Sequence, residues 1–271
     1  MWWIFGIGLL LLVVLGLAGR AQSNFTSSVQ QGIEQIEKTP PTRLPDLDEL
    51  PPLIRTYLER SGVDVGQTYS ATQLRQEGTI KLQQEGDWRE FEARQWFAVD
   101  RPAFLWAPSM PMPVGSVKGV DRLDGEEGRL EMRLFGIVPV ANEGGSQILK
   151  AQLLRYIAEL PWAPQAFAIN DEISFEQLDD RTVRATAEVG EVSATIEIFF
   201  DDEGDIVRVE TDERPWQQED GSYTPMPWGG TFADYREFDG IRVPTDVEVY
   251  WELPDGRYTY FRADVTNFGS R

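Results

Sequence analysis

The sequence contains neither cysteine nor histidine. Their absence excludes disulfide bonds, zinc sites built from thiolate or imidazole ligands, and catalysis by Ser-His-Asp or Cys-His groups. pH switching by imidazole is excluded for the same reason. Because so much catalytic chemistry is closed to this chain, we expect a protein that is not an enzyme and that needs no cofactor and no metal.

Lysine is scarce, and positive charge as a whole is outnumbered. The chain has 45 acidic against 25 basic residues, a formal net charge of −20. Its lysines are Lys38, Lys81, Lys118 and Lys150. A surface of this sign repels nucleic acid backbones and anionic membrane surfaces, so we exclude nucleic acid as a partner. An acidic, lysine-poor surface is typical of a protein kept soluble in a salty milieu.

Charge is absent from the amino-terminal run Trp2 to Gly19. As a helix this run would span about 27 Å, close to the hydrocarbon thickness of a bilayer, which is about 30 Å. Trp2 and Trp3 suit one membrane interface, and Arg20 ends the apolar run. The sequence therefore predicts a transmembrane anchor over residues 1–20, which makes the membrane a partner.

A cleaved signal peptide is the alternative for this run. The apolar region of a signal peptide is usually about 7 to 15 residues long and follows a Lys or Arg. The present run is longer and begins without a basic side chain. The anchor fits these features better, so we expect a single-pass protein of the cell membrane whose folded domain lies outside the cytoplasm.

Residues 21–50 are polar and then rich in proline, which predicts a linker behind the anchor. Within this linker, residues 28–38 have the apolar spacing of a short amphipathic helix. Pro51 and Pro52 suit the start of a further helix, and Ser61-Gly62 suits its end. We place the folded domain at residues 51–271.

The stretch from Thr231 to Trp251 gives the clearest strand signal. Residues alternate between two faces up to Phe238, Asp239-Gly240 turns the chain, and a second alternating run starts at Ile241. Runs of similar composition, separated by clusters of Gly, Pro and Asp, predict further strands. These runs are residues 68–84, 88–99, 103–109, 114–123, 129–138, 173–178, 182–189, 192–200, 206–210 and 258–265.

One helix interrupts the strands. From Ser146 to Leu160 apolar residues recur at intervals of three and four, the spacing of one buried helical face, and Pro161 ends the run. The strands before and after it form two meanders, about ten or eleven strands in all. The sequence therefore predicts a mainly β (α+β) fold, a strongly curved antiparallel sheet or incomplete β-barrel packed on one or two helices.

Four motifs carry a resemblance to a known family. They are the run from Leu153 to Trp162, then Pro227-Trp228-Gly229-Gly230, Phe238-Asp239-Gly240 and Arg242-Val243-Pro244-Thr245. Together they resemble an uncharacterised bacterial family that is catalogued only as a domain of unknown function. The likeness extends from about Leu50 to the C-terminus.

A shorter pattern runs from Tyr235 to Val249, with a tyrosine, an Asp-Gly turn, a proline and an alternating strand. This pattern resembles lipoprotein carriers of the LolA-like type. The resemblance implies a curved, incomplete antiparallel barrel whose helices plug an apolar cavity. It also implies handling of a lipid or lipid-linked group outside the cytoplasm, although a permanent anchor would distinguish this chain from a soluble shuttle.

Large apolar residues in or beside loops rich in Pro and Gly are the candidate ligand-binding residues. They are Trp106, Met110, Met112, Trp162, Met226 and Trp228. Methionine and aromatic side chains make an adaptable apolar lining, so we expect non-covalent binding of a lipid or another apolar molecule. The alternative is that these residues only fill the core, since a curved sheet needs large residues whether or not a ligand enters.

Paired carboxylates offer a different function. Glu159, with Asp234 or Asp239, has the residue type needed for a glycosidase-like hydrolase. Arg155 and Glu159 are four residues apart on the predicted helix, and such a pair is more often a surface ion pair. The hydrolase therefore stays an alternative to ligand binding.

The acidic run from Asp201 to Asp205 has the hard oxygen ligands that Ca²⁺ prefers. It lacks the EF-hand spacing, so a solvated hairpin turn is the favoured interpretation. A structural or partner-binding module of the cell envelope, with a filled interior and an exposed apolar patch, is the remaining alternative function.

Overall fold

The computed structural model describes residues 2–38, 47–64, 66–67 and 69–271, and side chains are described from residue 19 onward. The first group of strands is β1 (Ala71–Ile80), β2 (Arg89–Ala98), β3 (Ala103–Pro111), β4 (Ser116–Asp124), β5 (Glu127–Leu134) and β6 (Val138–Gly144). The second group is β7 (Ile173–Gln177), β8 (Thr182–Val189), β9 (Val192–Phe200), β10 (Ile206–Gln217), β11 (Tyr223–Phe238), β12 (Ile241–Leu253) and β13 (Gly256–Ser270).

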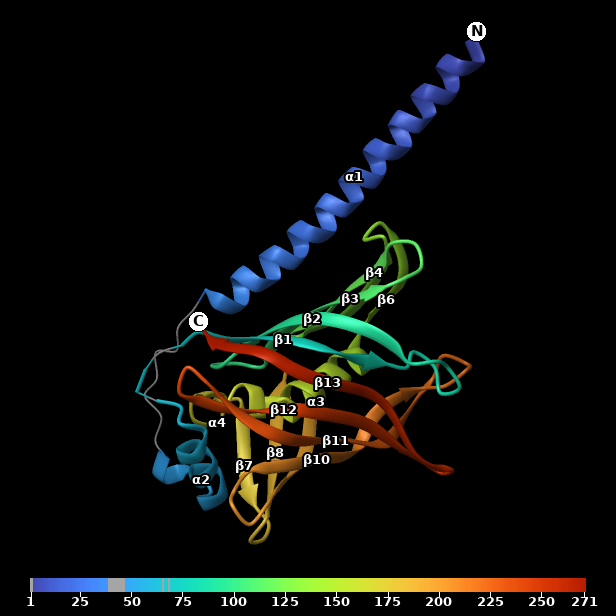
Figure 1. Ribbon diagram of the computed structural model, residues 1–271. Helices are drawn as coiled ribbons and strands as arrows, with labels where there is room; N and C mark the ends of the chain where they lie inside the picture. The colour runs from blue at the N-terminus through green and yellow to red at the C-terminus, as the bar shows by residue number, and fades with distance from the viewer. Residues whose placement is uncertain (1, 39–46, 65, 68) are drawn as a thin grey trace.

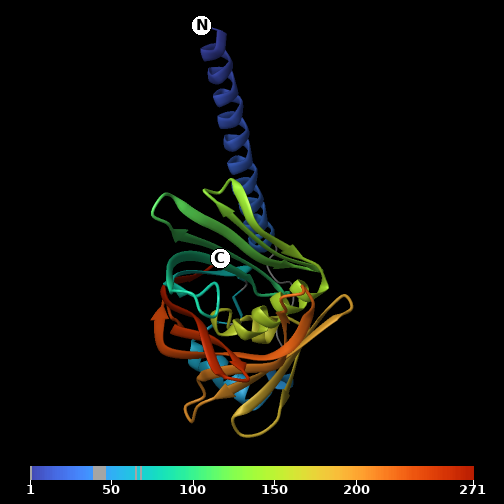
Figure 2. The same cartoon turned by 90° about the vertical axis from the view of Figure 1, so that its right-hand side faces the viewer.

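The strands form one antiparallel sheet of thirteen strands in the described part of the chain. Its order is β6-β5-β4-β3-β2-β1-β13-β12-β11-β10-β9-β8-β7, so two meanders meet where β1 pairs with β13. The sheet curls into a half-barrel around a central helix (Figures 1 and 2). The prediction of a mainly β, strongly curved antiparallel sheet is confirmed.

The predicted number of strands, ten or eleven, is wrong, and even the twelve strand-like runs in the sequence are one fewer than the thirteen strands of the sheet. The edge strand β6 was missed because nearly all its residues are exposed, so apolar and polar residues do not alternate along it. β10 continues to Gln217, seven residues beyond the predicted end at Glu210, because a bulge between Thr211 and Arg214 breaks the alternation there.

The helix α3 (Ser146–Ala158) lies on the concave face of the sheet (Figure 2). The sequence predicts this helix because Leu149, Leu153 and Ile157 recur every four residues, and all three are buried. A 3₁₀ turn, η2 (Leu160–Trp162), and the short helix α4 (Ala166–Ile169) follow it. Together these segments fill much of the interior of the half-barrel.

The first helix, α1 (Trp2–Glu37), runs across the opposite, convex face. Phe25, Ile33 and Ile36 pack there with Trp96 and Leu105 from β2 and β3. Residues 21–37 are therefore helical and packed, whereas the sequence predicts a linker over residues 21–50. The short helix expected at residues 28–38 is the end of this longer one.

The amino-terminal half of α1 extends away from the sheet (Figure 1). The predicted membrane anchor, residues 1–20, falls almost entirely on residues whose side chains lie outside the described part of the chain. Within that part, no helix has both the length and the apolar character that crossing a membrane requires. The anchor stays a prediction.

The helix α2 (Pro52–Ser61) begins and ends where the sequence predicts. Gly62 ends it with φ at 69°, and a Cβ at this position would lie 2.5 Å from the Gly240 carbonyl oxygen, so the close approach of the two turns requires glycine. A short 3₁₀ turn, η1 (Leu47–Glu49), precedes the helix.

Arginines from two elements bind one carboxylate and tie α2 to the sheet. Arg60 of α2 donates to Asp205 over 3.0 Å and 3.1 Å, and Arg242 of β12 donates to it over 2.5 Å and 2.7 Å. Asp205 lies at the end of the turn between β9 and β10, where the Asp201 carboxylate accepts two backbone hydrogen bonds. The hairpin turn predicted over residues 201–205 is confirmed, and the Asp205 carboxylate is occupied by guanidinium groups.

Replacing the shared carboxylate is expected to loosen α2 from the sheet. Asp205→Asn removes the anion that Arg60 and Arg242 share, leaving Arg60 its more exposed partner Glu203, and should lower the free energy of unfolding by about 2–3 kcal/mol. Asp202→Asn is the matched control in the same turn, because the Asp202 side chain is 80% exposed and its pair with Arg181 should contribute under about 1 kcal/mol. Urea unfolding at pH 7 measures both, and equal losses would contradict this role.

The same pair of proteins gives a pH test. Burial favours the neutral acid, but the hydrogen bonds and charges of Arg242 and Arg60 outweigh it and hold the pKa of Asp205 below its ordinary value of 3.8. The ionised group therefore stabilises the fold above about pH 4, and this contribution is lost as the pH falls through the lowered pKa. The stability difference between wild type and Asp205→Asn should stay constant from pH 7 to pH 5 and then narrow below about pH 4.

Candidate functional site

A cavity of about 270 Å³ lies on the concave face beside the C-terminal end of α3. Its apolar walls come from both meanders: Ile80, Leu82, Trp106, Met110, Leu130, Met132, Trp228, Val249 and Phe261. Leu82 is 59% exposed, so the lining reaches the surface at this side. The cavity therefore combines a buried apolar wall with a rim in contact with solvent.

Three of the six predicted ligand-binding residues meet in this cavity. Trp106 and Met110 come from β3 and Trp228 comes from β11. The Trp106 ring packs edge-on against Phe261 at 6.2 Å between centroids, and its Nε1 donates to Gln76 Oε1 over 2.9 Å. These contacts fix the ring as a wall of the cavity.

The other three predicted residues lie elsewhere. Trp162 is in the core below the cavity, where its Nε1 donates to the Pro244 carbonyl over 2.9 Å and its ring packs against Phe232. Met226 is half-buried beside the core, and Met112 closes the turn between β3 and β4. None of these three residues lines the cavity.

Charged side chains form one end of the cavity, a feature that the sequence does not reveal. Arg155 of α3 donates to Asp121 of β4 over 2.5 Å and to Glu159 over 2.9 Å. The three side chains are only 10 to 15% exposed. The interpretation of Arg155 and Glu159 as a surface ion pair is therefore wrong, because the helix face that carries them points into the half-barrel.

Two glutamines complete this buried cluster. Gln95 of β2 donates to Glu159 over 2.7 Å, and Gln152 of α3 donates to Asp121. Burial raises the pKa of both carboxyl groups, and the positive charge of Arg155 opposes that shift. Arg155 in turn has its pKa raised by the two carboxylates although burial disfavours its charge. Each charge is thus offset by a hydrogen-bonded partner, as burial requires.

A second arginine, Arg214 of β10, also lines the cavity. Its guanidinium lies 4.2 Å from the ring centre of Trp228 and 5.8 Å from that of Trp251, and it donates to the Ala151 carbonyl over 2.9 Å. Tyr260 of β13 lies at the same end and accepts a hydrogen bond from Trp228 Nε1 over 3.1 Å. Aromatic faces thus hold this cation in place.

The carboxylates proposed as partners of Glu159 lie far from this cluster in the sheet. Asp234 is an exposed residue of β11, paired with Arg236, and Asp239 is in the turn between β11 and β12. The carboxylate that does join Glu159 is Asp121. Sequence reasoning does not identify Asp121, since an acidic residue in a strand is ordinarily assigned to the exposed face.

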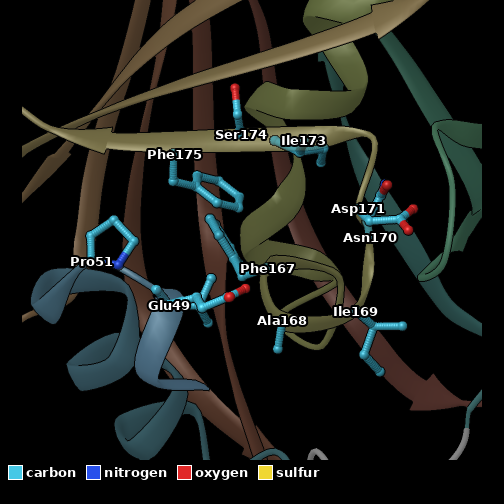
Figure 3. A pocket seen from close by; sticks show the side chains of 11 residues that line it. Glu49, Pro51, Phe167, Ala168, Ile169, Asn170, Asp171, Ile173, Ser174 and Phe175 are labelled. Carbon is cyan, nitrogen blue, oxygen red and sulfur yellow. The ribbon is translucent and has the colours of Figure 1, made fainter. Parts of the chain in front are cut away.

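A second pocket, of about 250 Å³, lies between η1, α4 and β7 (Figure 3). Phe167 and Phe175 face each other there, with ring centres 5.5 Å apart, and Asn170 and Asp171 line the adjoining loop. None of the predicted ligand-binding residues lines it. The cavity beside α3 is the candidate site because it gathers both the predicted residues and the buried charges.

Removing the central cation of the cluster should destabilise the protein strongly. Arg155→Met keeps most of the side-chain volume but leaves Asp121 and Glu159 buried without a counter-charge, so a loss of about 3–5 kcal/mol is expected. Lys150→Met, on the same helix but in a more exposed pair with Glu213, should cost under about 1 kcal/mol. Denaturant unfolding at pH 7 compares them, and similar midpoints would show that the cluster contributes little.

Three solved structures are similar to this chain. A LolA superfamily protein from Nitrosomonas europaea has 8% sequence identity and a TM-score of 0.44, over 81% of this chain and 92% of that chain. A putative outer membrane lipoprotein-sorting protein domain from Vibrio parahaemolyticus has 11% identity and a TM-score of 0.45, over 80% and 91%. A DUF1329 family protein from Desulfovibrio piger has 13% identity and a TM-score of 0.44, over 82% and 94%.

Similarity at this level does not specify a ligand or an activity. Among curated proteins, none matches the chain. Residues 40–263 match the model of a family described as a family of unknown function, DUF6544. This match covers most of the chain and confirms the predicted membership of an uncharacterised family. The protein is a member of the DUF6544 family.

Proposed function

We propose that the protein binds a lipid or another apolar molecule, non-covalently, in the cavity beside α3. The observation that carries this proposal is the cavity itself, about 270 Å³ of space with walls that include Trp106, Leu130, Met132 and Trp228. A concave space with apolar and aromatic walls and a few converging polar groups is typical of sites that bind small molecules.

The volume limits what can enter. A space of about 270 Å³ suits a short apolar chain or the end of a longer one. A longer ligand would leave past the exposed Leu82 into solvent.

We also propose that the domain works beside a membrane. The support is the uncharged run from Trp2 to Gly19, together with exposed apolar side chains at Val114, Phe135 and Val138. These three lie at or beside the turns that connect β3 to β4 and β5 to β6, which reach toward α1 (Figures 1 and 2). Apolar side chains in such a position favour contact with lipid.

The hydrolase is supported less well by the same geometry. Asp121 and Glu159 do share the cavity, as paired catalytic carboxylates must. Each already accepts hydrogen bonds from Arg155 and from a glutamine, so a substrate oxygen could reach either carboxyl group only by displacing one of these partners. The remaining alternative, a structural or partner-binding module, requires a filled interior. The cavity beside α3 does not fit that requirement.

Filling the cavity should abolish binding. Leu130→Trp adds a ring to the wall of the cavity, so the affinity for 1-octanol, an uncharged chain of suitable length, should fall at least about tenfold. Leu178→Trp makes the same change on the surface between β7 and β8 and should leave the affinity unchanged. Isothermal titration calorimetry measures both, with melting temperatures as a check on folding. Absence of octanol binding to the wild type would contradict the proposal.

The membrane proposal predicts that the full chain sediments with membranes and resists extraction by alkaline carbonate. Deletion of residues 1–20 should release the protein, because the uncharged run provides the hydrophobic contribution to insertion. Fractionation of a bacterial host that produces each form measures this. A full chain found in the soluble fraction would contradict the anchor without affecting the proposal of ligand binding.

A further inference from the structure

A β-bulge decides which side chain of β10 enters the cavity. Trp228 of β11 faces the cavity, and its cross-strand partner on β10 is Thr211. Two residues along β11, Met226 faces the same side, but its partner is Arg214, three residues along β10. The extra residue reverses the alternation, so that Arg214 points inward where regular pairing would place Glu213.

Glu213, the residue before Arg214, makes its hydrogen bonds outside the cavity. Its carboxylate accepts from the Thr195 backbone N–H over 2.7 Å and from Lys150 over 2.9 Å. The bulge thus brings Arg214 to the cavity, whereas Glu213 is held away from it by Lys150 and Thr195. Bulges are found next to binding and active sites because they redirect a side chain in this way.

The guanidinium of Arg214 is incompletely bound. It carries five N–H donors, and in the described part of the chain its hydrogen-bond acceptor is the Ala151 carbonyl, with no carboxylate within 4.0 Å. Arg155, by contrast, binds two carboxylates. Arg214 therefore retains the capacity for a bidentate contact with an anion.

We propose that the ligand is an anionic amphiphile, with its carboxylate or phosphate head on Arg214 and its apolar chain along Trp106, Leu130 and Met132. This rests on the proposed function and specifies its ligand. The head would lie at the charged end of the cavity, where Tyr260 can donate its hydroxyl proton to a second oxygen. The stacked Trp228 holds the guanidinium without occupying its N–H edge.

The competing account makes Arg214 a counter-charge alone. Asp121 and Glu159 share one cation, Arg155, so the cluster has a net charge of −1 that Arg214 offsets from a distance. If Arg214 is only a counter-charge, an anionic head group would not raise the affinity of a ligand for the cavity. The two accounts differ in how a head group changes affinity, and this difference can be measured.

The experiment compares 1-octanol, octanoate and octyl phosphate on the full chain at pH 7 by isothermal titration calorimetry. Octanoate or octyl phosphate should bind at least about tenfold more tightly than octanol, since a charge-assisted bidentate contact is added. Tighter binding of octanoate indicates a fatty acid, and tighter binding of octyl phosphate indicates a phospholipid. Arg214→Gln should remove the preference for the anions over octanol, and Arg214→Lys should show an intermediate preference.

Arg208→Gln is the matched control, since Arg208 lies on the same strand but stacks on Phe199 and pairs with Glu210 outside the cavity. It should keep the full preference. Equal affinities for octanol and both anions in the wild type would overturn the anionic ligand while leaving apolar binding intact. Failure of all three to bind would overturn both. A preference that survives Arg214→Gln, in a variant with unchanged melting temperature, would also overturn the role of Arg214.

Discussion

The interior of this protein is governed by a mismatch between the length of its strands and the length of its helix. α3 has 13 residues and so spans about 20 Å, whereas β12, also of 13 residues, spans about 43 Å. A single helix of this length cannot cover the concave face of such a sheet. Trp162, Phe167 and their neighbours fill part of the space beyond the C-terminal end of α3. The cavity lies beside that same end of the helix.

The chemistry of the cavity follows from how α3 ends there. Its last turn carries Arg155, and Glu159 follows directly, so the helix brings charges to the cavity. Buried charges require partners, and Asp121, Gln95 and Gln152 provide them. The result is a cavity with an apolar wall and a polar end, which is the distribution that an amphiphile presents.

Much of the fold follows from the sequence because it depends on local periodicity. Alternation from Ile241 onward identifies β12, and the spacing of Leu149, Leu153 and Ile157 identifies α3. The candidate site is harder to predict from the sequence, because it depends on which face of the sheet each strand residue points to. The acidic Asp121 turns inward with the pleat of β4, and Arg214 turns inward through a bulge, and neither residue type indicates burial by itself. Trp106 and Trp162 are alike in sequence, yet one lines the cavity and the other fills the core.

The central claim is that the space beside α3 is a true hollow that accepts apolar groups. A crystal structure of the protein under xenon pressure tests this most directly, because xenon binds against apolar walls and is located by its strong scattering. We expect a xenon atom in contact with Trp106, Leu130 and Trp228. Side chains of the protein closed over this space, with no xenon among them, would contradict the account.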